Sequence, residues 1–294
     1  MNFDKKTKAT QSITDYSDIL GDDFEKKSVS SAKSKKTIQT QRETASHELS
    51  KRTALAAMFI LLIIPAALIG MGSLMQTVKI KFNVFDTPIV LRLHYLASLL
   101  IIICTMIPFF MVFEKRKPQA RELITIATLA AIAVAGRWAF FFWPQFKPVC
   151  AVVIISGVCF GAESGFLVGA VTGFVSNFLF GQGAHTPWQM FCFGIIGFIA
   201  GLLFKKGLLR KNKIVLAIFG GIAVFVIYGG IINIGTMLGS GISITGEAVL
   251  ARYISAVPMD LIHAGSTVVF LLALSEPMIE KLDRIKIKYG LIEP

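Results

Sequence analysis

The chain has 294 residues, of which 54% are hydrophobic and only 16% are charged, and its formal net charge is +12. A soluble domain carries about 25% charged residues, so this composition excludes an ordinary soluble protein. The apolar residues are gathered in long runs, as membrane-spanning helices require. Because Lys and Arg collect in the cytoplasmic loops of membrane proteins, the positive charge does not by itself indicate nucleic-acid binding.

The first 52 residues are polar, rich in Ser, Thr, Lys and Asp, and contain no apolar run. This composition predicts a disordered polar tail over residues 1–52. No signal peptide is expected, because the first hydrophobic run begins late and has no small-residue cleavage pattern. Two hydrophobic segments precede the basic turn EKRKPQARE, so we predict a two-helix transmembrane hairpin over 53–118 and a six-helix domain over 119–294.

Eight segments are candidates for membrane helices, which normally need about 20 apolar residues. They are Thr53–Met75, Leu93–Phe113, Leu123–Phe142, Pro148–Phe160, Phe166–Phe180, Pro187–Phe204, Ile214–Leu238 and Ala248–Leu274. The fourth and fifth are short and are joined only by GAESG, which predicts a tight helical hairpin. The fold class expected is an all-α integral membrane protein. Between the first two helices, the alternation over Val78–Val84 fits either a short strand or an interfacial segment.

Basic residues predict the orientation. They cluster after the second, sixth and eighth helices, and with eight crossings all three clusters lie on the side of the N-terminal tail. The positive-inside rule makes that side cytoplasmic. We therefore expect a multi-pass protein of the cell membrane with both termini in the cytoplasm.

The predicted outer connection GRWAFFFWPQFKP combines aromatic and polar side chains, including Arg137, Trp138, Phe142, Trp143 and Gln145. Such a stretch fits an interfacial aromatic belt. It fits equally a ligand pocket, which is largely apolar with a few placed polar groups. The residues alone leave both interpretations open.

A second outer connection, SNFLFGQGAHTPW, interrupts two strongly apolar stretches. An unpaired amide in hydrocarbon costs about 2–7 kcal/mol, so Asn177 should face protein or a water-filled cavity. Thr186 and Pro187 resemble the N-cap and first position of a helix. That pattern does not explain the polar and aromatic residues gathered around them, which are Gln182, His185, Trp188 and Gln189. A lone histidine such as His185 is more often an ordinary loop residue than a residue that binds a ligand.

Later helices carry Asn233, Asp260 and His263 at membrane depth, where ionisable groups are functional candidates. Asp260 and His263 are three residues apart and can share a helix face. They could form a proton relay, or a hydrogen-bonded pair that neutralises itself.

The third helix carries a stripe of small residues, Ala127, Ala131 and Ala135, that lets another helix approach closely. Packing within the chain and docking of a partner are both compatible with it. The sequence has no G-x-x-x-x-G-K-[ST], H-E-x-x-H or G-x-S-x-G motif, so neither ATP hydrolysis by the chain nor a metal or other cofactor is expected.

From Leu123 onward the chain resembles the substrate-binding S components of energy-coupling factor (ECF) vitamin transporters. Six helices follow the EKRKPQARE turn, and the first carries the alanine stripe. The blocks AGRWAFFFWPQFKPV, FGAESGFLVGAVTGFVSNFLFGQGAHTPWQMF and FGIIGFIAGLLF look like the subgroup proposed to take up cobalamin. A compact S component has six helices, so the polar tail and the two extra helices depart from the pattern.

The resemblance implies a binding subunit that captures its vitamin on the outer side and is not an enzyme. The residues expected to bind the substrate are Arg137, Trp138, Phe142, Trp143, Gln145, Asn177, Gln182, His185, Trp188, Gln189 and Asn233. The stripe of Ala127, Ala131 and Ala135 would dock onto a transmembrane coupling subunit. Two cytoplasmic ATPases would drive that assembly, and the S component would topple in the bilayer to release its cargo.

Three alternatives remain open on sequence grounds. The cargo could be a cobalamin precursor, another vitamin or a nucleobase-like compound. The chain could be a proton-coupled secondary transporter that uses Asp260 and His263. It could also be a membrane-embedded enzyme acting on a lipid, although the acidic metal motif expected of such an enzyme is absent.

Overall fold

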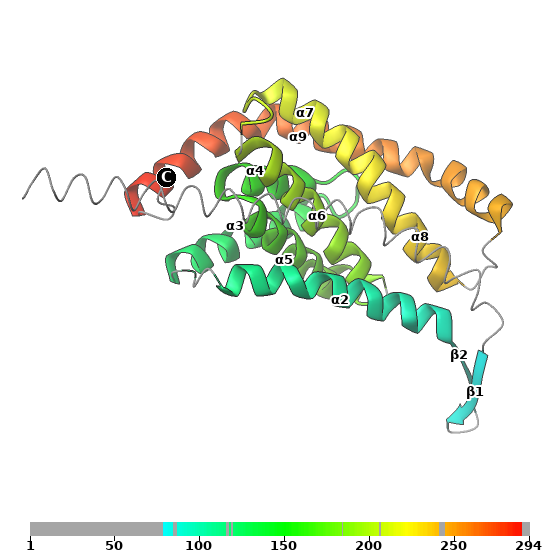
Figure 1. Ribbon diagram of the computed structural model, residues 1–294. Coiled ribbons are helices and arrows are strands. Elements are labelled where there is room, and N and C mark those ends of the chain that lie inside the picture. The colour runs from blue at the N-terminus through cyan, green and yellow to red at the C-terminus, as the bar shows by residue number, and fades with distance from the viewer. Residues whose placement is uncertain are drawn as a thin grey trace, which may run out of the picture. The chain divides into compact units, whose positions relative to one another are not determined.

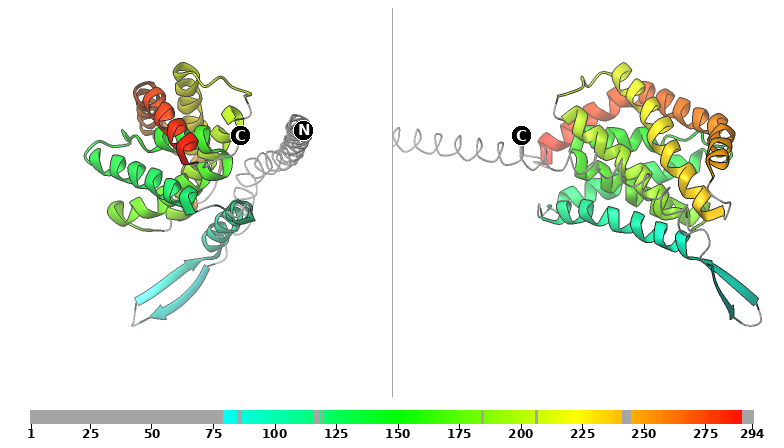
Figure 2. Two further views of the ribbon diagram at one scale, coloured as in Figure 1. Left: turned by 90° about the vertical axis from the view of Figure 1, so that its left-hand side faces the viewer. Right: turned by 45° about the vertical axis from the view of Figure 1, so that its right-hand side comes forward.

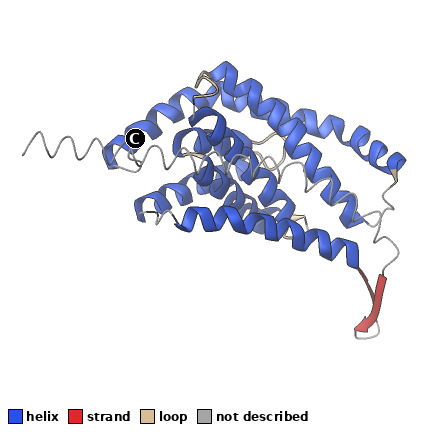
Figure 3. Ribbon diagram, viewed as in Figure 1, coloured by secondary structure: helices blue, strands red, loops and turns tan. Residues whose placement is uncertain are grey.

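The computed structural model describes residues 79–84, 87–115, 118, 120–183, 185–205, 207–240 and 245–289. These residues belong to one compact unit, Met58–Pro294, and they are helical apart from one short hairpin and the connecting loops (Figures 1 and 3). The predicted all-α fold class is thereby confirmed. The predicted tail 1–52 and the predicted helix Thr53–Met75 lie outside the described residues, and the predicted division into 1–52, 53–118 and 119–294 stays a prediction.

The elements follow one another along the chain with short connections. They are β1 (Lys79–Val84), β2 (Thr87–Arg92), α2 (Leu93–Lys115), α3 (Ala120–Ala139), α4 (Val149–Phe160), α5 (Ala162–Phe180), α6 (Thr186–Lys205), α7 (Lys213–Ile222), the π-helical segment η1 (Ala223–Tyr228), α8 (Gly229–Ser240) and α9 (Gly246–Tyr289). Among the described residues, five helices are long and apolar enough to cross a membrane: α3, α5, α6, α9 and the continuous run of α7, η1 and α8. Helix α4 is a shorter apolar helix.

Helix α4 lies at the centre of the bundle, because every one of its residues is buried. It packs against α5 and α6, which also pack closely against each other. Glycines make this approach possible: a Cβ added at Gly157 would lie 2.1 Å from the carbonyl oxygen of Gly197. Since no side chain fits there, the glycines are what allow α4 and α6 to approach so closely. The predicted tight hairpin between α4 and α5 is confirmed, with the single residue Gly161 at φ 102° joining the two helices.

Helix α2 packs along α5 and α6 (Figure 1). Phe109 is 5% exposed and stacks on Phe166 of α5 with ring centroids 4.1 Å apart. It also meets Phe198 of α6 edge-on at 5.0 Å. This extra helix is therefore an integral part of the bundle.

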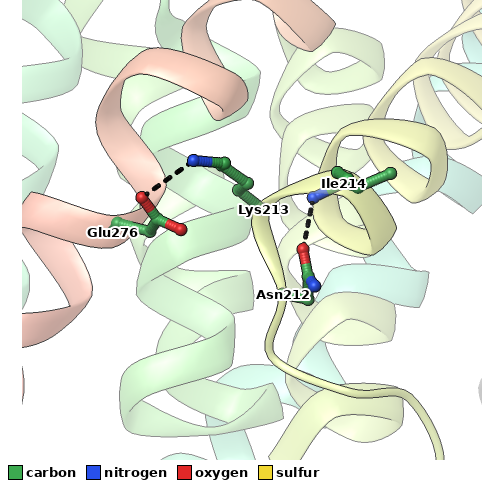
Figure 4. Close-up of polar contacts among 4 residues, drawn as sticks. All are labelled: Asn212, Lys213, Ile214 and Glu276. Atoms are coloured by element: carbon green, nitrogen blue, oxygen red, sulfur yellow. Dashed lines mark hydrogen bonds and ion pairs between the residues drawn. The ribbon is translucent and has the colours of Figure 1, made fainter.

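The run of α7, η1 and α8 packs along α9 (Figure 1). At the start of α7, the side chain of Asn212 accepts a hydrogen bond from the backbone N–H of Ile214 at 2.9 Å and caps the helix (Figure 4). Beside it, Lys213 forms an ion pair with Glu276 of α9 at 3.2 Å (Figure 4). The cap contributes about 1 kcal/mol, and the exposed ion pair about 0–1 kcal/mol.

Several element boundaries differ from the sequence prediction. Helix α3 ends at Ala139 rather than Phe142, where the chain enters a turn that brings Gln145 to φ 55°. Helix α9 continues past Leu274 to Tyr289, with Pro277 inside the helix. Of the two options for Val78–Val84, the described part, Lys79–Val84, is a strand. It pairs antiparallel with β2, which leads directly into α2 (Figure 2).

Candidate functional site

Arg137 lies in the last turn of α3 and is buried, with 9% of its surface exposed. Its Nη1 donates hydrogen bonds to the Ser176 hydroxyl and, at 2.9 Å, to Oδ1 of Asn177. Its Nη2 donates to Oε1 of Gln189 at 3.5 Å. The guanidinium carbon also lies 4.3 Å from the ring centroid of Phe180, which is within cation–π range. Arg137 therefore joins the ends of α3 and α5 to the start of α6.

Further hydrogen bonds extend from this centre. Nε2 of Gln189 donates to the Tyr228 hydroxyl at 3.0 Å, and Nδ2 of Asn177 donates to the Thr186 hydroxyl at 3.1 Å. Thr186 in turn donates to Oε1 of Gln182 at 2.9 Å. We call the buried residues of this set the Arg137 network: Arg137, Ser176, Asn177, Thr186, Gln189 and Tyr228. Nearly every polar group in it is satisfied inside the bundle, as a low-dielectric environment demands.

Local structure explains why these side chains meet. Helices α3 and α5 end, and α6 begins, at one end of the bundle, which we call the site end. Gly181 at φ 100° turns the chain after α5, and Gln182 Nε2 donates to the carbonyl of Phe174 at 2.9 Å to close that turn. Tyr228 lies in the π-helical segment η1. Short π-helical segments inside α-helices are frequently found at functional sites.

The loop between α3 and α4 carries a second cation, Lys147. Its Nζ lies 5.2 Å from the ring centroid of Phe180 and donates to the carbonyl of Trp143 at 3.4 Å. Burial lowers the pKa of Lys147 from its usual value, and the positive charge of Arg137 lowers it further. Among the described residues, no carboxylate pairs with Arg137 or Lys147. Within the described part of the chain, the hydrogen-bond partners of these two cations are all neutral.

The exposed aromatic residues that the sequence predicts to bind substrate lie outside the Arg137 network. Trp138, Phe142 and Trp143 are 52%, 90% and 63% exposed, and Gln145 is exposed in the same loop. A chain of ring contacts nevertheless leads from Trp138 through Phe141 to Phe180, with centroids 5.3 Å apart at each step. The exposed aromatic surface is thus connected to the ring that covers Arg137.

The other predicted residues occupy separate environments. His185 is exposed in the loop before α6. Trp188 is 1% exposed, and its indole Nε1 has no hydrogen-bond partner among the described residues. It packs so closely on α8 that a Cβ added at Gly235 would lie 2.5 Å from its ring. Asn233 donates to Asp260 at 2.8 Å and is not bonded to the Arg137 network.

Asp260 and His263 have different partners. The carboxylate of Asp260 accepts the bond from Asn233, whereas Nε2 of His263 lies 3.4 Å from the Cys150 sulfur. The His263 ring also meets the Tyr228 ring edge-on, with centroids 4.6 Å apart. The described side chains therefore do not form the self-neutralising pair that their spacing allows.

The alanine stripe lies on the exposed side of α3. Ala127, Ala131 and Ala135 are exposed, whereas Ala130 and Ala133 face the bundle and are buried. Packing against another described helix therefore does not account for the stripe.

Four participants in the site were not identified from sequence: Ser176, Phe180, Tyr228 and Lys147. A signal existed for Tyr228, because a lone hydroxyl in the apolar run FVIYGG must find a partner in the membrane. Thr186 was expected to cap α6. It is instead the first helical residue, and its hydroxyl accepts from the Gly183 backbone N–H and from Asn177.

A family model described as "ECF transporter, substrate-specific component" matches residues 121–275, which is more than half of the chain. The chain belongs to this family. As an ECF S component it is a transport subunit rather than an enzyme, and it is a multi-pass protein of the plasma membrane. Membership implies a small-molecule substrate and association with ECF coupling and ATPase modules.

Curated relatives of this S component carry the name UPF0397 protein. One from Aliivibrio fischeri (strain MJ11) is 32% identical over 164 residues, which cover 53% of this chain and 86% of the relative. Another from Aliivibrio salmonicida (strain LFI1238) is 31% identical over 158 residues, covering 51% and 84%. A third from Vibrio atlanticus (strain LGP32) is 29% identical over 125 residues, covering 40% and 68%. No solved structure matches the chain.

Proposed function

We propose that this S component captures cobalamin or a related corrinoid at the site end and delivers it inward with its coupling subunit and ATPases. The observation that carries the proposal is the Arg137 network, in which amide, hydroxyl and guanidinium groups from α3, α5, α6 and η1 converge inside a membrane protein. An ionisable side chain at membrane depth, here Arg137, is a candidate for a functional site by default.

The site end faces the outside of the cell in this proposal. The basic residues of the connections after α2 and α6 and of the C-terminal part of α9 lie at the opposite end, which the positive-inside rule assigns to the cytoplasm. The substrate then meets the exposed rings of Trp138, Phe142 and Trp143 before it reaches the buried amides.

The chemistry of a corrinoid suits this arrangement. Its macrocycle is large and apolar, and its rim carries carboxamides that exchange hydrogen bonds with amide side chains. Asn177 and Gln189 carry such amides, and each would exchange one bond of the Arg137 network for a bond to the substrate. Nε1 of Trp188, which has no partner among the described residues, supplies one more donor. Pockets that combine aromatic walls with a few placed polar groups are typical of small-molecule sites. Asn233, Gln182 and His185 would act at the periphery, with Gln182 closing the turn before α6.

The coupling subunit docks, in this proposal, on the exposed stripe of Ala127, Ala131 and Ala135. Small residues let two helix backbones approach closely, which favours association within a bilayer. The exposed position of the stripe supports docking over packing inside the chain.

Calorimetric titration of the purified chain in detergent with cobalamin, cobinamide and a panel of other vitamins tests the cargo. Trp188→Phe removes an N–H that has no partner among the described residues, so it should weaken corrinoid binding. Because Trp188 is buried, the Tm of the variant is measured alongside to show that it is folded at the titration temperature. Asn177→Ala should also weaken corrinoid binding. Asn212→Ala is the matched control, because it removes an amide at the opposite end of the bundle.

Binding of a corrinoid that both site variants weaken and Asn212→Ala does not would support the cargo and the pocket together. Binding of a different vitamin would replace the corrinoid and keep the S-component role. Corrinoid binding that is unchanged in Asn177→Ala and Trp188→Phe would refute the pocket assignment.

A further inference from the structure

Arg137 is a buried cation whose charge is not neutralised within the described part of the chain. Its three hydrogen-bond acceptors, on Ser176, Asn177 and Gln189, are all uncharged. Taking a guanidinium out of water is costly unless an opposite charge compensates it. A purely structural tie between α3, α5 and α6 needs only neutral hydrogen-bonding groups, so the retained positive charge requires another explanation.

Lys147 repeats the same feature beside it. The ring of Phe180 lies 4.3 Å from the Arg137 guanidinium carbon and 5.2 Å from Lys147 Nζ, so both cations contact one aromatic side chain. The only hydrogen bond of the Lys147 ammonium in the described region goes to the carbonyl of Trp143, which is neutral. Two cations held close together, with no carboxylate partner among the described residues, produce a positive potential that favours an anion.

The location is open to a ligand from the loop side. Phe180 is half-buried, and the residues that follow it, Gly181, Gln182 and Gly183, are exposed. Lys147 and Phe180 are half-buried whereas Arg137 is buried, so an anion from solvent reaches Lys147 and the ring more readily than the guanidinium.

We infer that Arg137 and Lys147 bind an anionic group of the transported substrate, a phosphate, phosphodiester or carboxylate, at the ring of Phe180. The neutral acceptors fix the orientation of the guanidinium and leave its charge for the ligand. A planar guanidinium suits this task, because its N–H groups match the geometry of phosphate and carboxylate oxygens. The inference deepens the proposed function and rests on it for the position of the substrate.

A pair of ligands isolates the charge. Cobinamide phosphate differs from cobinamide by one phosphate group, so the ratio of their dissociation constants for the full chain in detergent reports recognition of that group. We expect cobinamide phosphate to bind about tenfold or more tightly, as a charge-assisted hydrogen bond to a buried group implies. Arg137→Gln should bring the ratio close to one, and Arg137→Lys should retain part of it. Lys213→Gln, which removes a cation near the opposite end of the bundle, should leave the ratio unchanged.

A second measurement keeps the test independent of the folding of Arg137→Gln. Lys147→Gln, a loop substitution, should lower the ratio by a smaller factor. In the wild-type chain, added salt should weaken binding of cobinamide phosphate more than that of cobinamide. Equal affinities of the wild type for the two ligands, or a preference that survives both the Arg137 and the Lys147 substitutions, would overturn the inference and leave the corrinoid cargo standing.

Failure of both corrinoids to bind would instead remove the cargo. The dissociation constants are then compared for two other pairs of ligands. They are pyridoxal 5′-phosphate with pyridoxal, and biotin with its uncharged amide. Preference for the anionic member, lost in Arg137→Gln, would uphold the anion site. Equal binding of the uncharged member would overturn it.

Discussion

The contact between α2 and the rest of the bundle gives a sharp test of the packing. Phe109→Ala removes two ring contacts, the stack on Phe166 at 4.1 Å and the edge-on contact with Phe198 at 5.0 Å. Each aromatic pair contributes about 0.5–1.5 kcal/mol beyond area burial. Lipid or detergent replaces the apolar environment that is lost, so we count only these pair terms. The expected loss is about 1–3 kcal/mol, since the two contacts together give that sum.

The assay is thermal unfolding of the purified chain in one detergent. A loss of 1 kcal/mol lowers Tm by about 2–4 °C for a domain of this size, so Phe109→Ala should lower Tm by about 2–12 °C. Ile107→Ala is the control, because Ile107 lies on the same helix and is 48% exposed. A Tm of Phe109→Ala equal to that of Ile107→Ala would refute the claim that α2 is packed onto the bundle through this ring.

Three further predictions address other parts of the molecule. Gly197→Ala should destabilise the fold by about 1–3 kcal/mol through overpacking, because the added Cβ would lie 2.3 Å from a backbone oxygen of α5. Gly265→Ala is the control and should not lower Tm, because nothing lies within 4 Å of a Cβ added there. Tyr228→Phe leaves the amide that donates to its hydroxyl without an acceptor, and should cost about 1–3 kcal/mol in chemical unfolding; no loss would show that this bond is absent. Ala131→Leu should leave Tm unchanged and reduce co-purification with the coupling subunit, whereas Ala251→Leu on the exposed side of α9 should not; retained co-purification would remove the docking assignment.

The sequence predicted the helices well because long apolar runs in a membrane protein have few alternatives to helix. The short segments Pro148–Phe160 and Phe166–Phe180 appear as α4 and α5. Boundaries were less predictable. Helix α9 is 44 residues long, because the basic segment that follows the apolar residues continues the same helix. A prediction from hydropathy ends the helix where the apolar residues end, so it missed this extension.

The site was predictable only by region. The segment SNFLFGQGAHTPW does contribute Asn177 to the Arg137 network. However, the hydrogen bond from Arg137 to Asn177 joins two helices through residues that are 40 positions apart in sequence. Periodicity carries no information about such pairings. Nor could it distinguish buried Arg137 from exposed Trp138, its neighbour in sequence, since both occur in one aromatic run. Which residue faces inward depended on where α3 ends and how α5 packs on it.

The position of α2 bears on how this S component would move. Toppling, as the family resemblance implies, requires the substrate-binding helices to reorient together. Stacked rings join α2 to α5 and α6, so α2 must reorient with them unless Phe109 leaves its contact. The stripe of Ala127, Ala131 and Ala135 on α3 stays exposed in the presence of α2. The extra helix therefore leaves the proposed docking face open, and its consequence is a larger reorienting unit rather than a blocked coupling surface.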